Sequence, residues 1–202
     1  FAVTGLDEPV SEWASKTNPI FGSQQAADNA SDEINYILSD AAAITTLATP
    51  SGDSPGSWLY AKTKGVAVHA LARGFTSRVT ISLKKQMGRE RPDGSDNLSL
   101  PSGHTTQAYA SATLAVRNLD SIQLSERSRR ITQLGIKTMA ATTAWARVEA
   151  KRHYPSDVLA GAALAHFLNL VIHDAFMWQQ ENSFVTVAEG NDGTLIRVTW
   201  RY

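Results

Sequence analysis

The sequence predicts an all-α protein, a helical bundle that is followed by a C-terminal β-hairpin. Apolar residues recur at helical spacing through most of the chain, whereas they alternate over residues 184–202 on either side of a glycine-flanked turn. A chain of 202 residues is long enough to bury a core, so we expect one domain over 1–202. The chain has no cysteine, which excludes disulfides and thiolate chemistry.

The helices are predicted from their caps, their breakers and their apolar spacing. Residues 1–25, punctuated by prolines and a glycine, are expected to form loops and one short helix. Ser31 is predicted to cap the next helix, because acidic residues and then apolar residues at helical spacing follow it. After a loop rich in proline and glycine at 49–58, Gly88 and Pro92 end the second of the later helices. These later helices are predicted at 58–73, 75–88, 104–118, 125–148 and 156–180.

The last residues of the chain predict a different structure. Apolar residues alternate on both sides of Gly190-Asn191-Asp192-Gly193, which is a hairpin signal. A lone hairpin is only marginally stable, so we expect it to pack on the helices or on a partner. The sequence leaves the oligomeric state open.

Charge and hydropathy narrow the class of protein. The 19 basic and 19 acidic residues balance, so no binding to nucleic acid is expected. The most apolar helix, from Val158, is interrupted by His166 and Asn169 and lacks the run of about 18 apolar residues that is typical of a membrane span. We therefore expect no transmembrane helix and at most a peripheral contact with a membrane. The first residue is Phe1, which either a removed signal peptide or a trimmed boundary explains.

Pro101-Ser102-Gly103-His104 precedes an alanine-rich helix and suggests an anion site. Ser102 can cap this helix, which leaves free backbone N–H groups that point outward and attract phosphate. Gly103 leaves room for the anion, and His104 places a titratable group beside it. On its own, the pattern is better explained by a capped helix with an exposed histidine.

Two further clusters carry charge or a nucleophile. Lys84 and Arg91 are about two helical turns apart, and such side chains bind phosphate as a point charge and a bidentate fork. His153 and Asp157 flank Pro155 at the start of a helix, where the carboxylate can fix one imidazole nitrogen and leave the other as a nucleophile. Taken singly, the basic pair is better explained as a solvated basic face. An aspartate that only complements the helix dipole is the alternative for Asp157.

Together these residues form a pattern of fixed order and spacing: Lys84, Arg91, Pro92, Pro101, Ser102, Gly103, His104, Arg147, His153 and Asp157. The pattern resembles the three-part signature of the type 2 phosphatidic acid phosphatase and vanadium haloperoxidase superfamily. The motifs cover residues 84–157, and the resemblance implies the helical bundle of that superfamily. The chain departs from it at Ala146, where the family usually has serine, so one hydrogen bond near the site is in doubt.

The resemblance implies a phosphatase that needs no metal. His153 is then the nucleophile that forms a phosphohistidine, Asp157 orients it, and His104 protonates the leaving alcohol. The implied phosphate-binding residues are Lys84, Arg91, Ser102, Gly103 and Arg147. These cations can supply the electrostatic stabilisation, so no cofactor is expected.

Two other functions remain open at this point. A vanadium-dependent haloperoxidase would hold vanadate in the same pocket with His153 as ligand, although such enzymes tend to be larger than this chain. A non-catalytic protein that binds phosphate or lipid headgroups is disfavoured by the complete set of catalytic positions. The substrate is either a lipid phosphate such as phosphatidic acid or a small soluble phosphate ester, and the resemblance favours a periplasmic or secreted protein.

Overall fold

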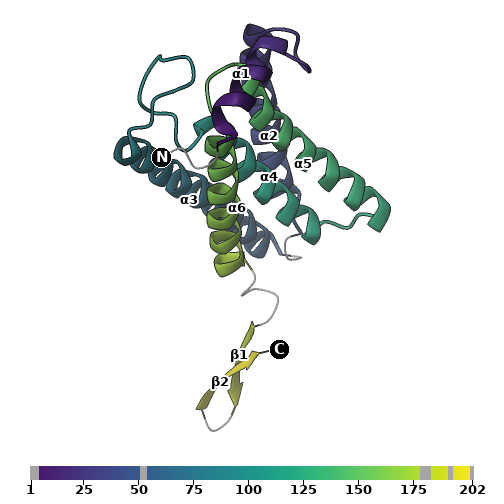
Figure 1. Ribbon diagram of the computed structural model, residues 1–202. Coiled ribbons are helices and arrows are strands. Elements are labelled where there is room, and N and C mark those ends of the chain that lie inside the picture. Colours follow the sequence, from purple (N-terminus) through teal and green to yellow (C-terminus); the bar gives the residue numbers. More distant parts are fainter. Residues whose placement is uncertain (1–4, 51–53, 178–182, 191–192, 201–202) are drawn as a thin grey trace.

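The computed structural model describes residues 5–50, 54–177, 183–190 and 193–200. Within these ranges the elements are, in order, α1 (Asp7–Thr17), α2 (Gln24–Ala48), α3 (Pro55–Met87), α4 (Gly103–Ser121), α5 (Glu126–Glu149), α6 (Pro155–Met177), β1 (Ser183–Gly190) and β2 (Gly193–Trp200). Helix α4 is central, because it packs against α2, α3, α5 and α6 (Figure 1). The predicted helical bundle is therefore confirmed.

Small side chains allow α4 to lie at the centre of the bundle. The main buried cluster joins this helix to α2 and α5, and consists of Leu38, Ala42, Ala108, Ala112, Ala115, Leu119, Ile136 and Ala140. Alanine lets the helix backbones approach closely on several sides at once. The position of the N-terminus of α4, which starts at Gly103, is thus fixed by packing along the whole helix.

Two helix boundaries differ from the prediction. The ranges 58–73 and 75–88 form one continuous helix, α3, in which Gly74 has open space around it. One glycine costs about 1 kcal/mol relative to alanine, which is too little to interrupt a long helix. Helix α2 begins at Gln24 and not after Ser31, because the Ser23 hydroxyl accepts the cap hydrogen bond from the Ala26 N–H at 3.1 Å.

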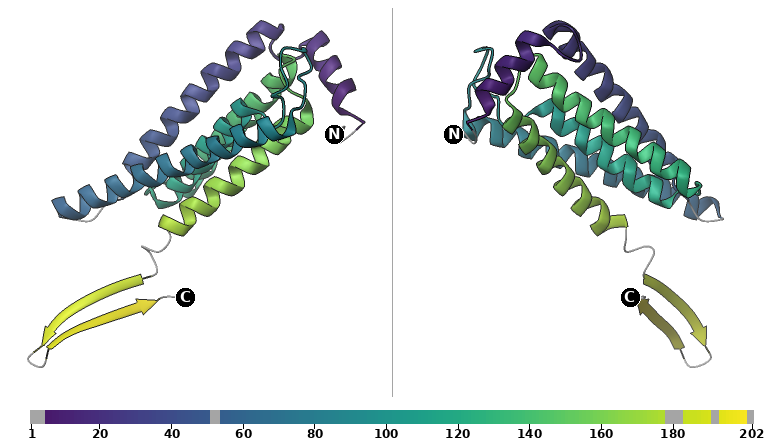
Figure 2. Two further views of the ribbon diagram at one scale, coloured as in Figure 1. Left: turned by 90° about the vertical axis from the view of Figure 1, so that its left-hand side faces the viewer. Right: turned by 45° about the vertical axis from the view of Figure 1, so that its right-hand side comes forward.

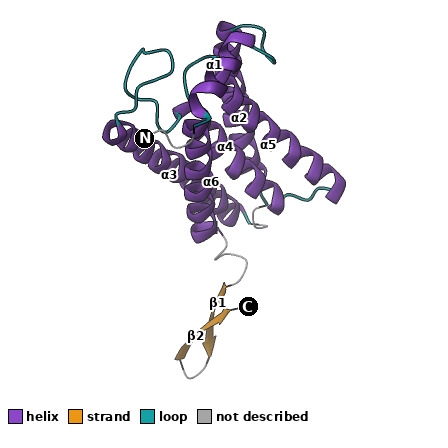
Figure 3. Cartoon of the chain, in the orientation of Figure 1, coloured by secondary structure: helices purple, strands orange, loops and turns teal. Residues whose placement is uncertain are grey.

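The end of α3 and the following loop return the chain to the start of α4. Gly88 adopts a left-handed conformation, with φ at 55°, and its N–H donates to the Lys84 carbonyl at 3.1 Å, as the predicted helix end requires. The loop between α3 and α4 then folds back, and the Ser99 N–H donates to the Arg89 carbonyl at 2.9 Å. This loop, α1 and the start of α6 gather at one end of the bundle (Figure 3).

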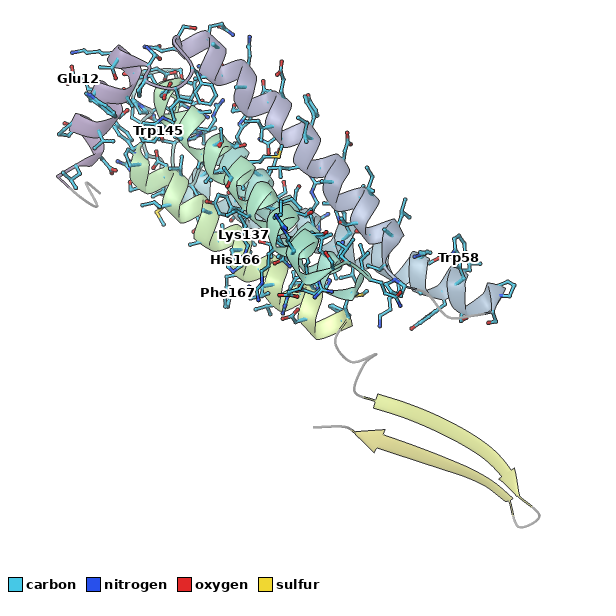
Figure 4. The ribbon with its side chains drawn as sticks, turned by 90° about the vertical axis from the view of Figure 1, so that its right-hand side faces the viewer. Glu12, Trp58, Lys137, Trp145, His166 and Phe167 are labelled. Carbon is cyan, nitrogen blue, oxygen red and sulfur yellow. The ribbon has the colours of Figure 1, made fainter. Side chains whose placement is uncertain are left out.

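The N-terminal helix α1 is fixed at this same end. The Trp13 and Trp145 rings lie 6.2 Å apart, and Figure 4 shows Trp145 on α5 next to α1. The buried Glu149 carboxylate accepts the N–H groups of Ile20 and Phe21 at 3.1 Å each, which anchors the connection from α1 to α2. The joined ends of α2 and α3 lie at the opposite end of the bundle (Figure 2).

The two strands beyond α6 pair with each other in antiparallel register. Ser183 lies opposite Trp200, and Gly190 lies opposite Gly193. The predicted turn residues Asn191 and Asp192 lie outside the described residues. The packing of these strands on the helices or on a partner remains a prediction.

Helix α6 corrects the expectation that the chain has no transmembrane helix. It is long and apolar enough to cross a membrane, and 22% of its most apolar stretch is buried in the bundle. The two polar residues that interrupt the apolar sequence each make a hydrogen bond to a neighbouring helix. Asn169 donates to the Thr76 hydroxyl at 2.9 Å, and His166 lies 3.0 Å from the Thr113 hydroxyl. Polar groups bonded to neighbouring helices are tolerated at membrane depth, so they do not exclude a span.

A glycine sets the distance between α6 and the start of α4. A Cβ on Gly161 would lie 2.8 Å from the Ser102 carbonyl oxygen. We expect Gly161→Ala to lower the free energy of unfolding by about 1–3 kcal/mol, because the backbone itself must move. Gly135→Ala on α5 is the matched control, since its added methyl meets nothing within 4 Å, and it should raise stability by up to about 1 kcal/mol. Thermal unfolding of the two purified variants tests this, and equal midpoints would contradict it.

Candidate active site

The three sequence motifs meet around one cavity at the α1 end of the bundle. Its volume is about 300 Å³. The side chains and backbone that line it are Ser77, Thr80, Ile81, Lys84, Arg91, Gly103, His104, Thr106, Gln107, Arg147 and His153. Six of the predicted site residues thus line one cavity, although they come from α3, α4, α5 and two loops.

The other two predicted residues lie behind the cavity wall. Ser102 and Asp157 are both fully buried. The Ser102 N–H donates to the Asp157 backbone carbonyl at 3.0 Å, which joins the start of α4 to the start of α6. The Ser102 hydroxyl caps α4 by accepting from the Thr105 N–H at 3.5 Å. Ser102 therefore shapes the helix end and does not line the cavity itself.

Arg147 is the best sign that the cavity takes an anion. It is 4% exposed, and its Nη1 donates to Asp28 and, at 3.0 Å, to the Ser31 hydroxyl. Its Nε is buried and has no partner among the described residues. A buried donor without a partner is costly, and a ligand oxygen in the cavity would satisfy this N–H.

The other cations surround the same space. The Arg91 Nη1 lies 3.4 Å from His153 Nε2, and the Lys84 ammonium donates to the Leu98 carbonyl at 2.5 Å. Burial, and next the charge of Arg91, lower the pKa of Lys84 to about 8, so it still carries its charge at neutral pH. Among the described residues, no group of three or more His, Cys, Asp or Glu side chains is placed to hold a metal ion.

His153 is held neutral inside this cluster of cations. It is 1% exposed, and its backbone N–H donates to the Arg147 carbonyl at 3.2 Å. Burial, together with the charges of Lys84, Arg147 and Arg91, lowers the pKa of His153 to about 4, although Asp157 acts in the opposite direction. At pH 5–8 the imidazole therefore keeps the lone pair that a nucleophile requires.

The structure places Ser99 between His153 and Asp157, where the sequence predicted a direct hydrogen bond. His153 Nδ1 and Asp157 Oδ2 are 3.8 Å apart, which is beyond hydrogen-bond distance. The Ser99 hydroxyl donates to Asp157 Oδ2 at 2.5 Å and lies 3.5 Å from His153 Nδ1. Asp157 is thus connected to the imidazole through the serine, and sequence analysis missed Ser99 because it lies outside the motif letters.

Arg89 is a second residue that sequence analysis missed. Its guanidinium donates to Asp157 Oδ1 at 2.8 Å and to Asp7 Oδ2 at 2.8 Å, and it lies 4.2 Å from the centre of the Tyr154 ring. The Ser156 hydroxyl and N–H also donate to Asp7. Helix α1 is thereby connected through Arg89 to the Asp157 carboxylate. The available signal was the position of Arg89 two residues before Arg91 in the same basic cluster.

Helix α2 supplies a third group that no motif predicted. Asp28 accepts from both Arg147 and Arg152, the latter at 3.1 Å. Asp32 Oδ1 lies 2.7 Å from His104 Nε2, and the Asn35 amide donates to the His104 carbonyl at 3.3 Å. Spacing of three and four residues places these side chains on one face of α2.

The contact between Ser99 and Asp157 predicts a measurable effect on turnover. We expect Ser99→Ala to lower kcat about 10-fold with little change in KM, because the imidazole loses its orientation while the cations remain. Ser111→Ala is the matched control, since Ser111 is equally buried but its hydroxyl has no partner among the described residues. Steady-state kinetics of both variants tests the prediction. Similar losses in the two variants would show that only buried packing matters at Ser99.

Comparison with known proteins agrees with this geometry. Residues 65–181 match the family model of the PAP2 superfamily. A stretch of 95 residues is 42% identical to the lipid A 1-phosphatase of Porphyromonas gingivalis, and it makes up 47% of this chain and 20% of that protein. The chain thus matches only about a fifth of that relative's length.

Two crystal structures share the fold. One is described as the first transmembrane PAP2 type phosphatidylglycerolphosphate phosphatase, from Bacillus subtilis, with a TM-score of 0.64 and 18% identity over 86% of this chain and 88% of that chain. The other is LpxE of Aquifex aeolicus, with a TM-score of 0.56 and 20% identity over 85% of this chain and 97% of that chain. With the exposed apolar helix α6, these relatives overturn the expectation of a periplasmic or secreted protein that only touches a membrane.

The family is established by the extent of the match and by the site. The matched residues include all three motifs, most of α3, and the whole of α4, α5 and α6. The predicted resemblance is thus confirmed. Because the family model matches more than half of the chain, the protein belongs to the PAP2 superfamily of phosphatases.

Proposed function

We propose that the protein hydrolyses lipid phosphate monoesters through a phosphohistidine at His153. The observation that carries this proposal is a buried, neutral imidazole in a cavity that it shares with Lys84, Arg91 and Arg147. The cations neutralise the phosphate oxygens, and the neutral imidazole supplies the electron pair. The orphaned Nε of Arg147 provides one further donor for a phosphate oxygen.

The proposed hydrolysis proceeds in two steps. In the first, His153 Nε2 attacks phosphorus, the bond to the leaving oxygen breaks, and His104 gives its proton to that oxygen. In the second, a water molecule attacks phosphorus while His104 takes a proton from it, and the N–P bond breaks to release phosphate. A correctly placed acid contributes roughly 10²–10⁴-fold, so electrostatic stabilisation and nucleophile placement supply the remainder.

The exterior of the bundle favours a lipid over a soluble substrate. On α6, Leu159 and Phe167 are 70% and 63% exposed, and apolar residues such as Ile44 on α2 and Leu134 on α5 are exposed too. Apolar surface of this extent marks contact with a membrane or a partner. We propose that α6 lies in a membrane and that the substrate reaches the cavity from it. The relatives described as a lipid A 1-phosphatase and a phosphatidylglycerolphosphate phosphatase agree with this proposal.

The test is phosphate release by the detergent-solubilised protein in the presence of EDTA. Phosphatidic acid, phosphatidylglycerol phosphate and lipid A are compared with a soluble aryl phosphate, and orthovanadate serves as a competitor. We expect metal-independent release, inhibition by vanadate and a higher kcat/KM for a lipid than for the soluble ester. A preference for the soluble ester would contradict the lipid substrate. If the protein released phosphate from none of these esters but oxidised bromide in the presence of vanadate and peroxide, the proposed phosphatase activity would be contradicted.

A further inference from the structure

His104 has one ring nitrogen engaged and one free. Its Nε2 lies 2.7 Å from Asp32 Oδ1, whereas Nδ1 has no hydrogen-bond partner among the described residues. The imidazole also lines two cavities, the one that contains His153 and a polar neighbour of about 270 Å³ that Asp32 lines too. His104 therefore lies between the cavity that contains His153 and the carboxylate of Asp32.

The carboxylate comes from a part of the chain that the family model does not cover. Asp32 lies on α2, before residues 65–181, which are the residues that the family model matches. Two further contacts hold this side of His104 in place. The Asn35 amide on the same helix donates to the His104 carbonyl, and Asp28 bonds to Arg147, which lines the same cavity.

We propose that Asp32 is the positioning residue of the general acid, with Asp32 accepting the Nε2 proton so that Nδ1 delivers its proton to the leaving oxygen. The carboxylate fixes the ring orientation and stabilises the protonated form of His104, which is the form that donates in the first step. This inference rests on the proposed function, in which His104 protonates the leaving group. Asp32 itself touches neither the phosphate nor the leaving oxygen.

Charged groups face His104 from several elements. They are Asp28 and Asp32 on α2, Lys84 on α3, Arg91 in the loop before α4, Arg147 on α5 and His153 before α6. Burial and next the charge of Arg147 lower the pKa of His104, while the hydrogen bond and the charge of Asp32 raise it. Loss of the Asp32 charge therefore reduces the protonated fraction of His104, and the alkaline limb of kcat moves to lower pH.

The leaving group provides the sharpest test of a role in proton delivery. An alkoxide such as that of a lipid alcohol leaves poorly without a proton, whereas a nitrophenolate leaves readily without one. Asp32→Asn should therefore lower kcat by about 10-fold or more for a lipid phosphate and by less than about 3-fold for p-nitrophenyl phosphate. Asp32→Glu should restore part of the lipid activity, because it returns the carboxylate.

Glu33→Gln is the matched control. Glu33 is the next residue on α2, it is exposed, and it makes no hydrogen bond or ion pair with described residues, so this change removes the same charge without touching His104. The Asp32 side chain is 54% exposed, so both variants should fold, and thermal unfolding verifies this. The control should keep the activity and the pH profile of the wild type.

The outcomes separate this inference from the proposed function. Equal losses for the two substrates in Asp32→Asn, or an alkaline limb that does not move, would overturn the role of Asp32 while wild-type hydrolysis stands. Wild-type protein that releases no phosphate in the same assay would overturn the proposed function, and the inference with it. The role of Asp32 would be supported if Asp32→Asn lost kcat selectively with the lipid ester and its alkaline limb moved to lower pH, and if Glu33→Gln showed neither change.

Discussion

His153→Ala should lower kcat by about 10⁴-fold or more, with a folded protein and little change in thermal stability. In the proposed mechanism the imidazole is the attacking group, and removal of a nucleophile typically costs most of an enzyme's rate. Phosphate release from a lipid phosphate in EDTA measures the loss. Alkaline quenching of wild-type enzyme with ³²P-labelled substrate should trap an acid-labile phosphoprotein that the variant does not form.

His166→Ala is the control for this prediction. His166 bonds to the Thr113 hydroxyl and lines a different cavity, of about 580 Å³, in which Figure 4 shows it near Lys137. Its replacement should leave kcat within about 3-fold of the wild type. If His153→Ala retained substantial activity, or if label remained on it, a nucleophile other than His153 would be required.

Arg147→Lys should raise KM and lower kcat/KM by about 10²-fold. The guanidinium has two roles in the proposed mechanism, because Nη1 binds Asp28 and Ser31 while the unpaired Nε is available to a phosphate oxygen. A single ammonium cannot satisfy both sides with the same geometry, although it keeps the charge. Steady-state kinetics and the inhibition constant of orthovanadate measure the effect, and vanadate should bind more weakly to the variant.

Arg117→Lys is a closely matched control. Arg117 also has a buried Nε without a partner among the described residues and also forms an ion pair, with Asp174, but it lines the 580 Å³ cavity. Its replacement should change kcat/KM less than 3-fold. Equal effects of the two variants would mean that the loss of an ion-paired guanidinium, and not of a phosphate contact, explains the result.

Helices with strong local signals were predictable from the sequence. Helix α5 begins one residue after its Ser125 cap and ends next to the predicted residue 148, and α3 ends before Gly88 as its glycine requires. The division of α3 was wrong, because the signal at Gly74 is weak and packing against α4 and α6 overrides it. Ser31 was wrong as a cap, since a serine followed by acids also occurs inside a helix, where here it binds Arg147.

The motif residues were predictable because each motif is short and carries an unusual spacing. Ser99 and Arg89 lie within the same span of sequence, but nothing distinguishes them there from other polar loop residues. The residues that α1 and α2 contribute to the site could not be predicted from the sequence, because their contacts join residues far apart in the chain. Asp32 and His104 are 72 residues apart, and Asp7 and Ser156 are 149 apart.

By itself, the sequence determined the helical class, the family motifs and the chemical identity of the groups at the site, since these depend on local spacing. Only the tertiary structure decided the environment of those groups. It buries His153 among cations, places Ser99 between it and Asp157, and bonds the Asn169 amide N–H to Thr76 inside the bundle. The physical reason is that pKa, hydrogen-bond satisfaction and exposure depend on neighbours brought together by folding, and no local pattern specifies them.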